Sequence, residues 1–331
     1  MSAPIALTMG EPAGIGGEIA LKSWLKRTEG VPPFFVIDSP ARLRDLATAL
    51  SLAVPLQEIS APGEAIGCFD TTLPVLALSR GVDAIAGKPE SATAGAVIES
   101  IERAVQLCQS GNASAVVTNP IQKSTLIAAG FAHPGHTEFL AVLAGPGSQA
   151  VMMLACAELR VVPVTIHVSL GEAARTLTDD AIMRCARVTA AALARDFGVA
   201  QPRLAVAGLN PHAGEDGAMG REEIDIIAPA LGQLRTEGID VRGPLPADTM
   251  FHAAARQTYD AALCMFHDQA LIPIKTIDFE GGVNTTLGLP FVRTSPDHGT
   301  ALDIAGQGVA SPTSLIAALK LAAEMAARRA A

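Results

Sequence analysis

Three histidines each follow an apolar run that predicts a buried strand. They are His167 in VTIHVSL, His212 in GLNPHAGE and His267 in CMFHDQA. The carboxyl ends of parallel strands are where α/β enzymes hold reactive side chains, because the strand is rigid and its end faces a crevice. Three neutral imidazoles that converge there would bind a divalent metal and leave a coordination position open. The alternative is three unrelated histidines that merely end strands.

Residues suited to a small anion occur in other loops. In HPGHTEFLA, His136 and Thr137 stand where an apolar helix is expected to begin. A helix N-terminus with an imidazole and a hydroxyl can hold an anion or a hydroxylated substrate, although Thr137 could instead be only an N-cap. Lys275, in the apolar segment LIPIKTI, suggests contact with a carboxylate or phosphate, or proton transfer; the alternative is a surface lysine.

The segment GGVNTTLGLPFVRTSPDHGTALD combines several polar side chains with glycines that leave its backbone accessible. Asn284 and Arg293 lie in it, and we expect Arg293 to project from the end of a short strand and grip a carboxylate or phosphate with two hydrogen bonds. Asp268, directly after His267, can orient that imidazole. These residues together predict a pocket for a metal ion and a small anionic substrate.

The glycine-rich turn at 14–17 follows the first expected strand. It does not fit the G-x-G-x-x-G pattern of a dinucleotide-binding turn, and a tight connection from strand to helix explains its glycines equally well. The sequence therefore contains no standard Rossmann nucleotide motif.

Apolar runs and helical patterns alternate along the chain, which predicts an α/β fold with helices on the faces of a parallel sheet. Strands are expected at 5–10, 34–39, 113–121, 158–170, 202–210 and 259–267, and helices at 18–26, 91–109, 122–129, 178–198, 221–238 and 311–330. The helix at 178–198 is expected to be capped by Thr178.

Composition narrows the class of protein. The chain has 331 residues, of which 49% are hydrophobic and 17% charged, and its formal net charge is −9. An acidic chain without a basic block is a poor candidate for binding nucleic acid. Five cysteines without a CxxC pair indicate reduced thiols, and neither a signal peptide nor a membrane span is apparent. We therefore expect a soluble, cytoplasmic protein, and the low charge suggests a surface covered by another subunit.

The motifs resemble, in combination, the 4-hydroxythreonine-4-phosphate dehydrogenase family of pyridoxal phosphate biosynthesis. The resemblance runs from TMGEPAGIGGEI through VVTNPIQK, HPGHTEFLA, VTIHVSL, GLNPHAGE and MFHDQ to GVNTTLGLPFVRTSPDHGTALDIAG. It implies two α/β/α domains around a cleft, as in isocitrate and isopropylmalate dehydrogenases, and a homodimer with its active sites at the subunit interface. The expected domains are 1–135 plus 295–331, and 136–294.

The resemblance also implies roles for individual residues. The metal ligands fall on His167, His212 and His267, with one ligand expected from the partner chain. Asp248, in LPADTMF, and Asp268 match acidic residues near the family's site, and both are candidates for a catalytic role together with Lys275 and His136. A metal-bound water is a further candidate for the base. The substrate-binding residues fall on His136, Thr137, Lys275, Asn284 and Arg293.

The implied reaction is oxidation of 4-phosphooxy-L-threonine by NAD or NADP, followed by decarboxylation to 3-amino-2-oxopropyl phosphate with the help of Zn, Mg or Co. Three alternatives remain open at this point: a dehydrogenase of a sugar-acid phosphate such as threonate or erythronate 4-phosphate, a phosphate acyltransferase of similar fold, and a non-catalytic metal-binding protein.

Overall fold

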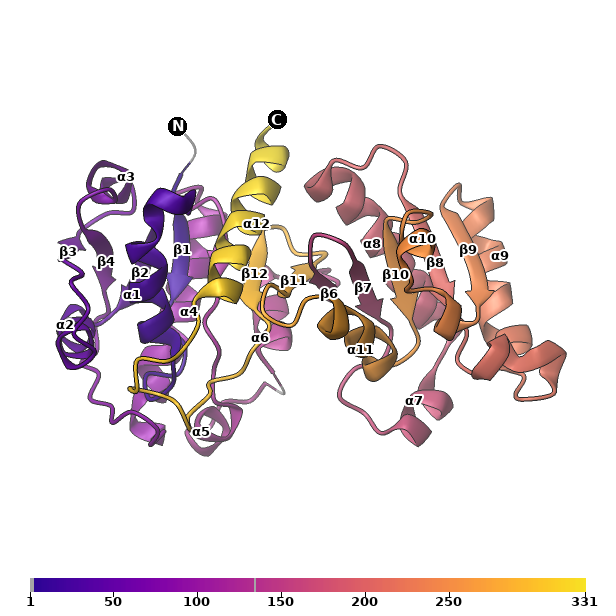
Figure 1. Ribbon diagram of the computed structural model, residues 1–331, viewed down its shortest axis with the longest axis horizontal. Helices are drawn as coiled ribbons and strands as arrows, with labels where there is room; N and C mark the ends of the chain where they lie inside the picture. The colour runs from indigo at the N-terminus through magenta and orange to yellow at the C-terminus, as the bar shows by residue number, and fades with distance from the viewer. Residues whose placement is uncertain (1–2, 134) are drawn as a thin grey trace. The chain divides into compact units, whose positions relative to one another are not determined.

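The computed structural model describes residues 3–133 and 135–331, which form two compact units (Figure 1). Unit 1 comprises Met1–Ala150 and Leu289–Ala331, and unit 2 comprises Val151–Gly288. Residues 1, 2 and 134, which belong to the expected first domain, lie outside the described residues. In the described ranges, each unit contains six β-strands with helices packed on their faces, so the predicted α/β fold is confirmed.

Unit 1 is built on a parallel sheet with the strand order β3-β4-β2-β1-β5-β12. Its strands are β1 (Ile5–Thr8), β2 (Phe34–Asp38), β3 (Leu56–Ile59), β4 (Leu73–Ala77), β5 (Val116–Val117) and β12 (Arg293–Pro296). Every residue of β1 and β2 is buried, which explains why these strands are apolar runs without polar alternation.

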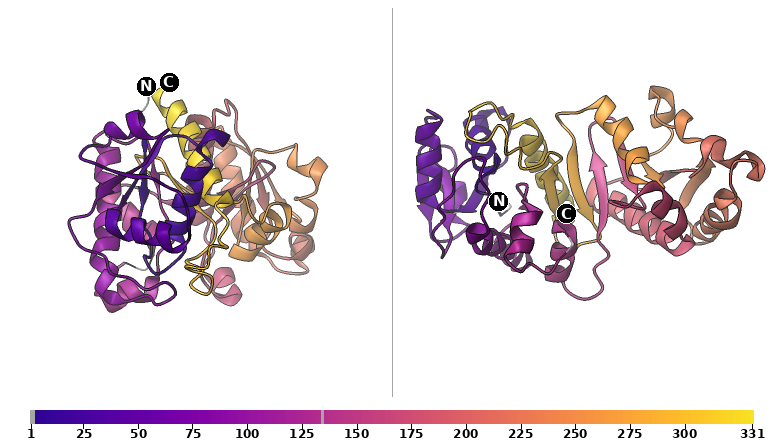
Figure 2. Two further views of the ribbon diagram at one scale, coloured as in Figure 1. Left: turned by 60° about the vertical axis from the view of Figure 1, so that its left-hand side comes forward. Right: turned by 90° about the horizontal axis from the view of Figure 1, so that it is seen from below.

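Helices cover both faces of this sheet (Figures 1 and 2). They are α1 (Gly16–Leu25), α2 (Pro40–Ala49), α3 (Glu64–Cys68), α4 (Ala94–Gln109), α5 (Lys123–Ala128), α6 (His136–Ala144) and α12 (Thr313–Ala330), with short turns η1 (Arg27–Glu29) and η2 (Ser91–Thr93). Helices α1 and α12 contact each other on one face, and α4 packs with α6 on the other. A Cβ at Gly16 would lie 2.9 Å from the Met9 carbonyl oxygen, so close packing of strand and helix accounts for a glycine there.

Unit 2 has a mixed sheet with the strand order β11-β6-β7-β10-β8-β9. Its strands are β6 (Val151–Ala155), β7 (Arg160–Pro163), β8 (Arg203–Ala207), β9 (Asp240–Leu245), β10 (Ala261–Cys264) and β11 (Val283–Leu287). The predicted parallel arrangement is confirmed for β7, β10 and β8, and β9 extends it. Strands β6 and β11 were not predicted, and β6 runs antiparallel to both β7 and β11.

The helices of unit 2 are α7 (Leu170–Thr176), α8 (Asp179–Phe197), α9 (Ala228–Thr236), α10 (Ala253–Arg256) and α11 (His267–Ile277), with the turns η3 (Pro211–Gly217), η4 (Glu223–Ile227, a π-helical turn) and η5 (Ala247–Thr249). Helices α8 and α9 share one apolar cluster with the sheet, and α11 belongs to another. Helix α8 begins as predicted, because the Thr178 side chain accepts a hydrogen bond from the Ala181 N–H.

The boundaries between the units differ from those expected from the sequence. Residues 136–150 and 289–294 lie in unit 1, whereas they were expected in the central domain. The reason is packing: Phe139 and Leu140 of α6 join the same apolar cluster as Val97 and Ile101 of α4. His136 and Arg293 consequently belong to unit 1.

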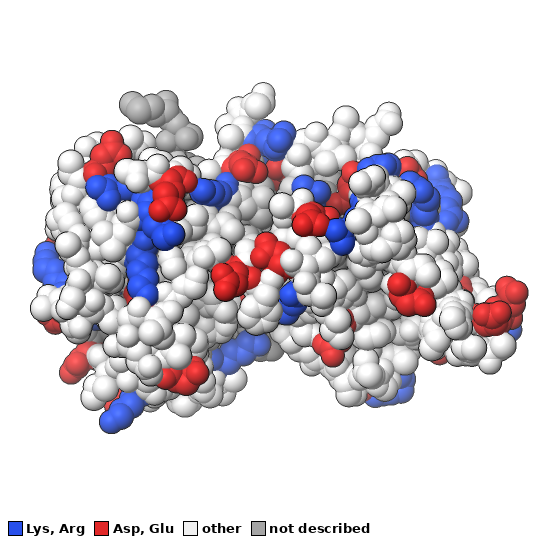
Figure 3. Space-filling model, in the orientation of Figure 1, with Lys and Arg blue, Asp and Glu red and all other residues white. Residues whose placement is uncertain are grey.

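Charged side chains of both signs are interspersed over the face of the molecule drawn in Figure 3. Among the described residues, none of the helices has the length and apolar character needed to span a membrane.

Candidate active site

The three predicted metal ligands, His167, His212 and His267, follow three neighbouring parallel strands of unit 2. His167 follows β7, His267 follows β10 and His212 follows β8, and the order of these strands in the sheet is β7-β10-β8. Their carboxyl ends therefore lie at one edge of the sheet, where reactive side chains of α/β proteins gather.

Side-chain hydrogen bonds connect these strand ends to one another. The Thr165 hydroxyl donates to the Met265 carbonyl at 2.7 Å, which ties the segment before His167 to the segment before His267. Gln269 accepts from the Met265 N–H at 2.6 Å and donates to the Gly208 carbonyl at 2.8 Å, which ties the end of β10 to the end of β8. Side-chain hydrogen bonds therefore hold the three segments together in addition to the backbone hydrogen bonds of the sheet.

Two of the histidines lie side by side. The ring centroids of His167 and His267 are 5.7 Å apart, with an angle of 43° between the ring planes. The Nδ1 atom of His267 lies 2.7 Å from Oδ1 of Asp268. A carboxylate in that position holds the proton on Nδ1 and leaves Nε2 as a metal ligand. Both rings line a small cavity of about 210 Å³, together with Val168, Leu170, Phe266 and Asp268.

His212 is exposed and lies in η3, where its φ is 51°. No group of three His, Cys, Asp or Glu side chains in the described part of the chain is close enough to bind a metal ion. The structure thus brings His167 and His267 together, as a metal site needs, but does not assemble all three histidines within one chain. Two imidazoles, one of them oriented by a carboxylate, fit part of the ligand set of a divalent ion.

The two acidic candidates line one neighbouring cavity. Asp248, in η5, and Asp268 contribute to a cavity of about 300 Å³ that also includes Phe251 and Ile272. Lys275 lies on α11, with Nζ 5.5 Å from the centroid of the Phe279 ring. Asn284 lies in β11, and its Oδ1 is buried without a hydrogen-bond partner in the described structure. An orphaned buried acceptor of this kind is what a ligand donor would satisfy.

In unit 1 the predicted anion-binding residues form a second group. Arg293 is only 4% exposed, and its Nε and Nη2 atoms donate to the Thr118 hydroxyl at 3.2 and 2.7 Å. Burial lowers the pKa of its guanidinium to about 10. Arg293 begins β12, opposite Val116, and so does not project from a strand end as expected. The strand starts later because the chain bends at Pro290 and Phe291, within the preceding LPFV run.

His136 lies beside this arginine. It is the first residue of α6, whose N-cap is Gly135, so Thr137 is not the N-cap. Its Nε2 atom is buried and has no hydrogen-bond partner in the described structure. Burial lowers the pKa of His136 well below its ordinary value, and the positive charges of Arg293 and Lys123 lower it further. The imidazole is therefore neutral near pH 7, ready to share a hydrogen bond with a ligand.

Sequence reasoning missed four residues that support these groups. Thr118 holds Arg293, Asn119 has a buried Oδ1 without a hydrogen-bond partner in the described structure, and Gln269 joins strand ends. The Glu223 carboxylate accepts a hydrogen bond from the Leu209 N–H, in the segment before His212. The first two could have been found, since VVTNPI shows polar residues directly after a buried strand.

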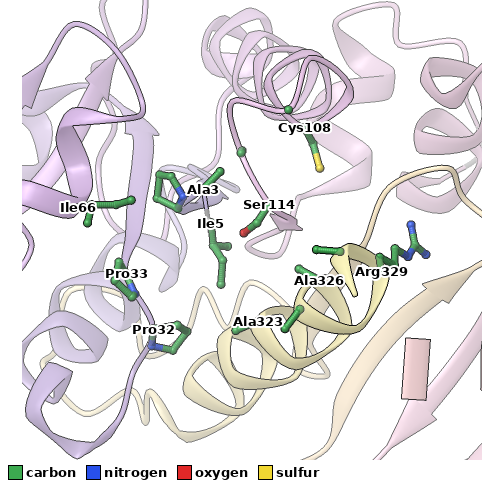
Figure 4. A pocket seen from close by; sticks show the side chains of 15 residues that line it. Ala3, Ile5, Pro32, Pro33, Ile66, Cys108, Ser114, Ala323, Ala326 and Arg329 are labelled. Carbon is green, nitrogen blue, oxygen red and sulfur yellow. The ribbon is translucent and has the colours of Figure 1, made fainter. Parts of the chain in front are cut away.

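Another cavity lies elsewhere in unit 1, at the amino ends of β1 and β2 (Figure 4). Its volume is about 690 Å³, and alanine, proline and isoleucine side chains form most of its lining. Cys108 borders it, and burial raises the pKa of this thiol to about 11. None of the predicted site residues lines this cavity.

The family model described as "Pyridoxal phosphate biosynthetic protein PdxA" matches residues 31–322. The chain belongs to this family. A PdxA-family relative named 4-hydroxythreonine-4-phosphate dehydrogenase, from Methylorubrum extorquens, is 58% identical over 98% of this chain and 95% of its own length. A relative of the same name from Caulobacter vibrioides is 52% identical over 99% of both chains.

Solved structures give the same result. The crystal structure of 4-hydroxythreonine-4-phosphate dehydrogenase from Klebsiella pneumoniae has a TM-score of 0.87 and 39% identity, and the match covers 98% of this chain and 100% of that one. A branched-chain phosphotransacylase from Enterococcus faecalis matches with a TM-score of 0.56 at 12% identity, over 97% of this chain and 99% of its own. That second likeness concerns the fold alone.

Proposed function

We propose that this PdxA-family chain is a 4-hydroxythreonine-4-phosphate dehydrogenase of pyridoxine 5′-phosphate biosynthesis. It would oxidise the secondary alcohol of 4-phosphooxy-L-threonine with NAD or NADP, and the resulting β-keto acid would lose CO2 to give 3-amino-2-oxopropyl phosphate. The observation that carries this proposal is the 58% identity, over 98% of the chain, to a relative of that name.

The proposed metal site uses His167 and His267 of one subunit and His212 of a second copy of this chain. The 5.7 Å separation of the first two rings supports their pairing. Asp268 would keep the proton of His267 on Nδ1, so that Nε2 faces the ion. A divalent ion held there, Zn, Mg or Co, would act as a Lewis acid toward the oxygen atoms of the substrate.

The proposed homodimer agrees with the apolar residues beside these histidines. Leu170 is 66% exposed and Ile272 is 63% exposed in the single chain, and Val168 next to His167 is exposed as well. Large apolar side chains grouped at a functional edge indicate a surface that another protein covers. A second copy is the occupant that would also supply the missing imidazole.

For the substrate, we propose Arg293, His136, Thr137, Lys275 and Asn284 as binding residues. Arg293 and Lys275 would offset the carboxylate and phosphate charges in a chain whose net charge is −9. A neutral His136 can accept a proton from a hydroxyl, which makes it, with Lys275, a candidate base. Asp248 and Asp268 are candidate catalytic residues next to the proposed metal site.

The test is turnover of purified protein with each candidate substrate. We expect NADH or NADPH formation with 4-phosphooxy-L-threonine, its loss after chelator treatment, and its return on adding a divalent ion. Nucleotide reduction only with threonate or erythronate 4-phosphate would instead indicate the sugar-acid alternative. Acyl transfer that persists in chelator would contradict the proposal and indicate a phosphate acyltransferase.

A further inference from the structure

Glu223 is a buried acidic residue that contacts the segment carrying His212. It begins η4 and is only 3% exposed. Its Oε1 atom accepts hydrogen bonds from the backbone N–H groups of Leu209 at 2.7 Å and Asn210 at 2.8 Å. Its Oε2 atom accepts from Nδ2 of Asn210 at 3.0 Å. Burying a carboxylate is unfavourable unless hydrogen bonds replace its water, so these amide donors are what make its position tolerable.

The segment that Glu223 contacts has an unfavourable backbone conformation. His212, Ala213, Glu215 and Asp216 have φ values of 51°, 52°, 44° and 54°. Residues with a Cβ rarely adopt this left-handed conformation, and a run of them persists only if surrounding structure holds it. Such runs occur mainly where a function requires them.

The carboxylate also packs against the middle of this turn. Gly214 has a φ of 81°, and a Cβ there would lie 2.5 Å from Oε2 of Glu223. Glu223 therefore fixes the turn at two points: the backbone that enters it, through Leu209 and Asn210, and the residue two positions after His212. A loss of the carboxylate would free both points at once.

We propose that Glu223 is a positioning residue for His212. It holds the left-handed turn in one conformation, so that the imidazole is presented to the divalent ion without reorganisation. This inference rests on the proposed function, in which His212 is a metal ligand. Partners that orient metal ligands typically change metal affinity about 10- to 100-fold.

The experiment measures the affinity of metal-free, full-length protein for Co²⁺ alone, by competition with a chelator. Glu223→Gln keeps the size of the side chain. The new NH2 group would face Nδ2 of Asn210, so that two hydrogen-bond donors would meet without an acceptor between them. We expect about 10- to 100-fold weaker Co²⁺ binding. Asp225→Asn is the control in the same turn η4, because the Asp225 carboxylate accepts from the Arg221 guanidinium at 3.1 and 2.8 Å instead of from this segment. Its affinity should stay near that of the wild type.

A double variant separates positioning from general stability. If Glu223 acts through His212, then His212→Ala/Glu223→Gln should bind Co²⁺ as weakly as His212→Ala alone, because the effects of coupled residues do not add. A further loss in the double variant would overturn the positioning role. Should Glu223→Gln fail to fold, Glu223→Asp keeps the charge, withdraws the carboxylate and should give an intermediate loss.

The failures of the two proposals are distinguishable. Weak binding by His212→Ala with wild-type binding by both Glu223 variants would overturn the role of Glu223 and leave the metal site intact. Wild-type binding by His212→Ala would overturn the proposed ligand set itself, and the inference on Glu223 with it.

Discussion

Among the single residues of the candidate site, some have positive φ values and others have lowered pKa values. His167 and His212 both have positive φ values, 53° and 51°, which few residues other than glycine adopt. His136 and Arg293 have lowered pKa values because both are removed from water. Two of the predicted metal ligands and two of the predicted substrate ligands are thus held in states that are unfavourable for an isolated residue.

The lowered pKa of His136 predicts a loss of stability in acid. Below the ordinary value of 6.5, the unfolded chain binds a proton at His136 that the folded protein does not bind. The free energy of unfolding should therefore fall as pH falls below 6.5, by up to about 1.4 kcal/mol per pH unit from this residue. His136→Asn should lack this contribution.

Chemical denaturation of both proteins between pH 7.5 and 5 measures the effect. The stability difference at pH 7.5, where the imidazole is neutral in both states, reports packing alone and serves as the control. Parallel curves for the wild type and His136→Asn over the whole range would contradict the prediction.

At the level of secondary structure, the segments that follow β7, β8 and β10 carry the three histidines, and polar side chains anchor such segments. In unit 2 these anchors are Gln269 and Glu223. In unit 1, Arg42 on α2 pairs with Asp38 at the end of β2 and donates to the Pro12 carbonyl at 3.2 Å, which fixes the turn after β1. Loops that follow parallel strands need such anchors, since the sheet itself ends before them.

The Asp38–Arg42 pair allows a matched stability test. Its side chains are 1% and 8% exposed. Arg42→Met leaves a buried carboxylate without its cation and should lower the free energy of unfolding by about 3–5 kcal/mol. Lys26 and Glu29 form an exposed pair in the same unit, so Lys26→Met should cost less than about 1 kcal/mol. Urea denaturation followed by circular dichroism gives both values, and equal losses would refute the argument.

At the scale of the whole molecule, the proposed metal site and the proposed dimer depend on each other. A symmetric dimer would contain two sites, each with His167 and His267 from one subunit and His212 from the other. Exposed apolar residues such as Leu170 and Ile272 would then be covered at the interface. This arrangement makes a prediction that no single-chain site can meet.

Co-expression of two inactive variants with different affinity tags tests it. A heterodimer of His212→Ala and His167→Ala should contain one intact site, and should recover about half of the wild-type activity and metal content per dimer. His167→Ala with His267→Ala is the control and should recover neither, because each proposed site would then lack a ligand. Recovery in the control pair, or in no pair, would contradict the proposed division of ligands.

Local sequence patterns predicted the fold class, several of the strands and helices, and the strand ends that carry the histidines. These follow from local periodicity and from end signals such as Thr178, which act over a few residues. These patterns missed β3, β9 and β11, whose segments LQEI, DVRGPL and VNTTL mix polar with apolar residues, and they also missed β4 and β6. Tertiary packing, by contrast, brings His167 next to His267, buries Arg293 against Thr118 and places Glu223 against the segment that leads to His212. These contacts depend on the packing of segments distant in the chain and on the exclusion of water. The spacing of residues along the chain predicts neither.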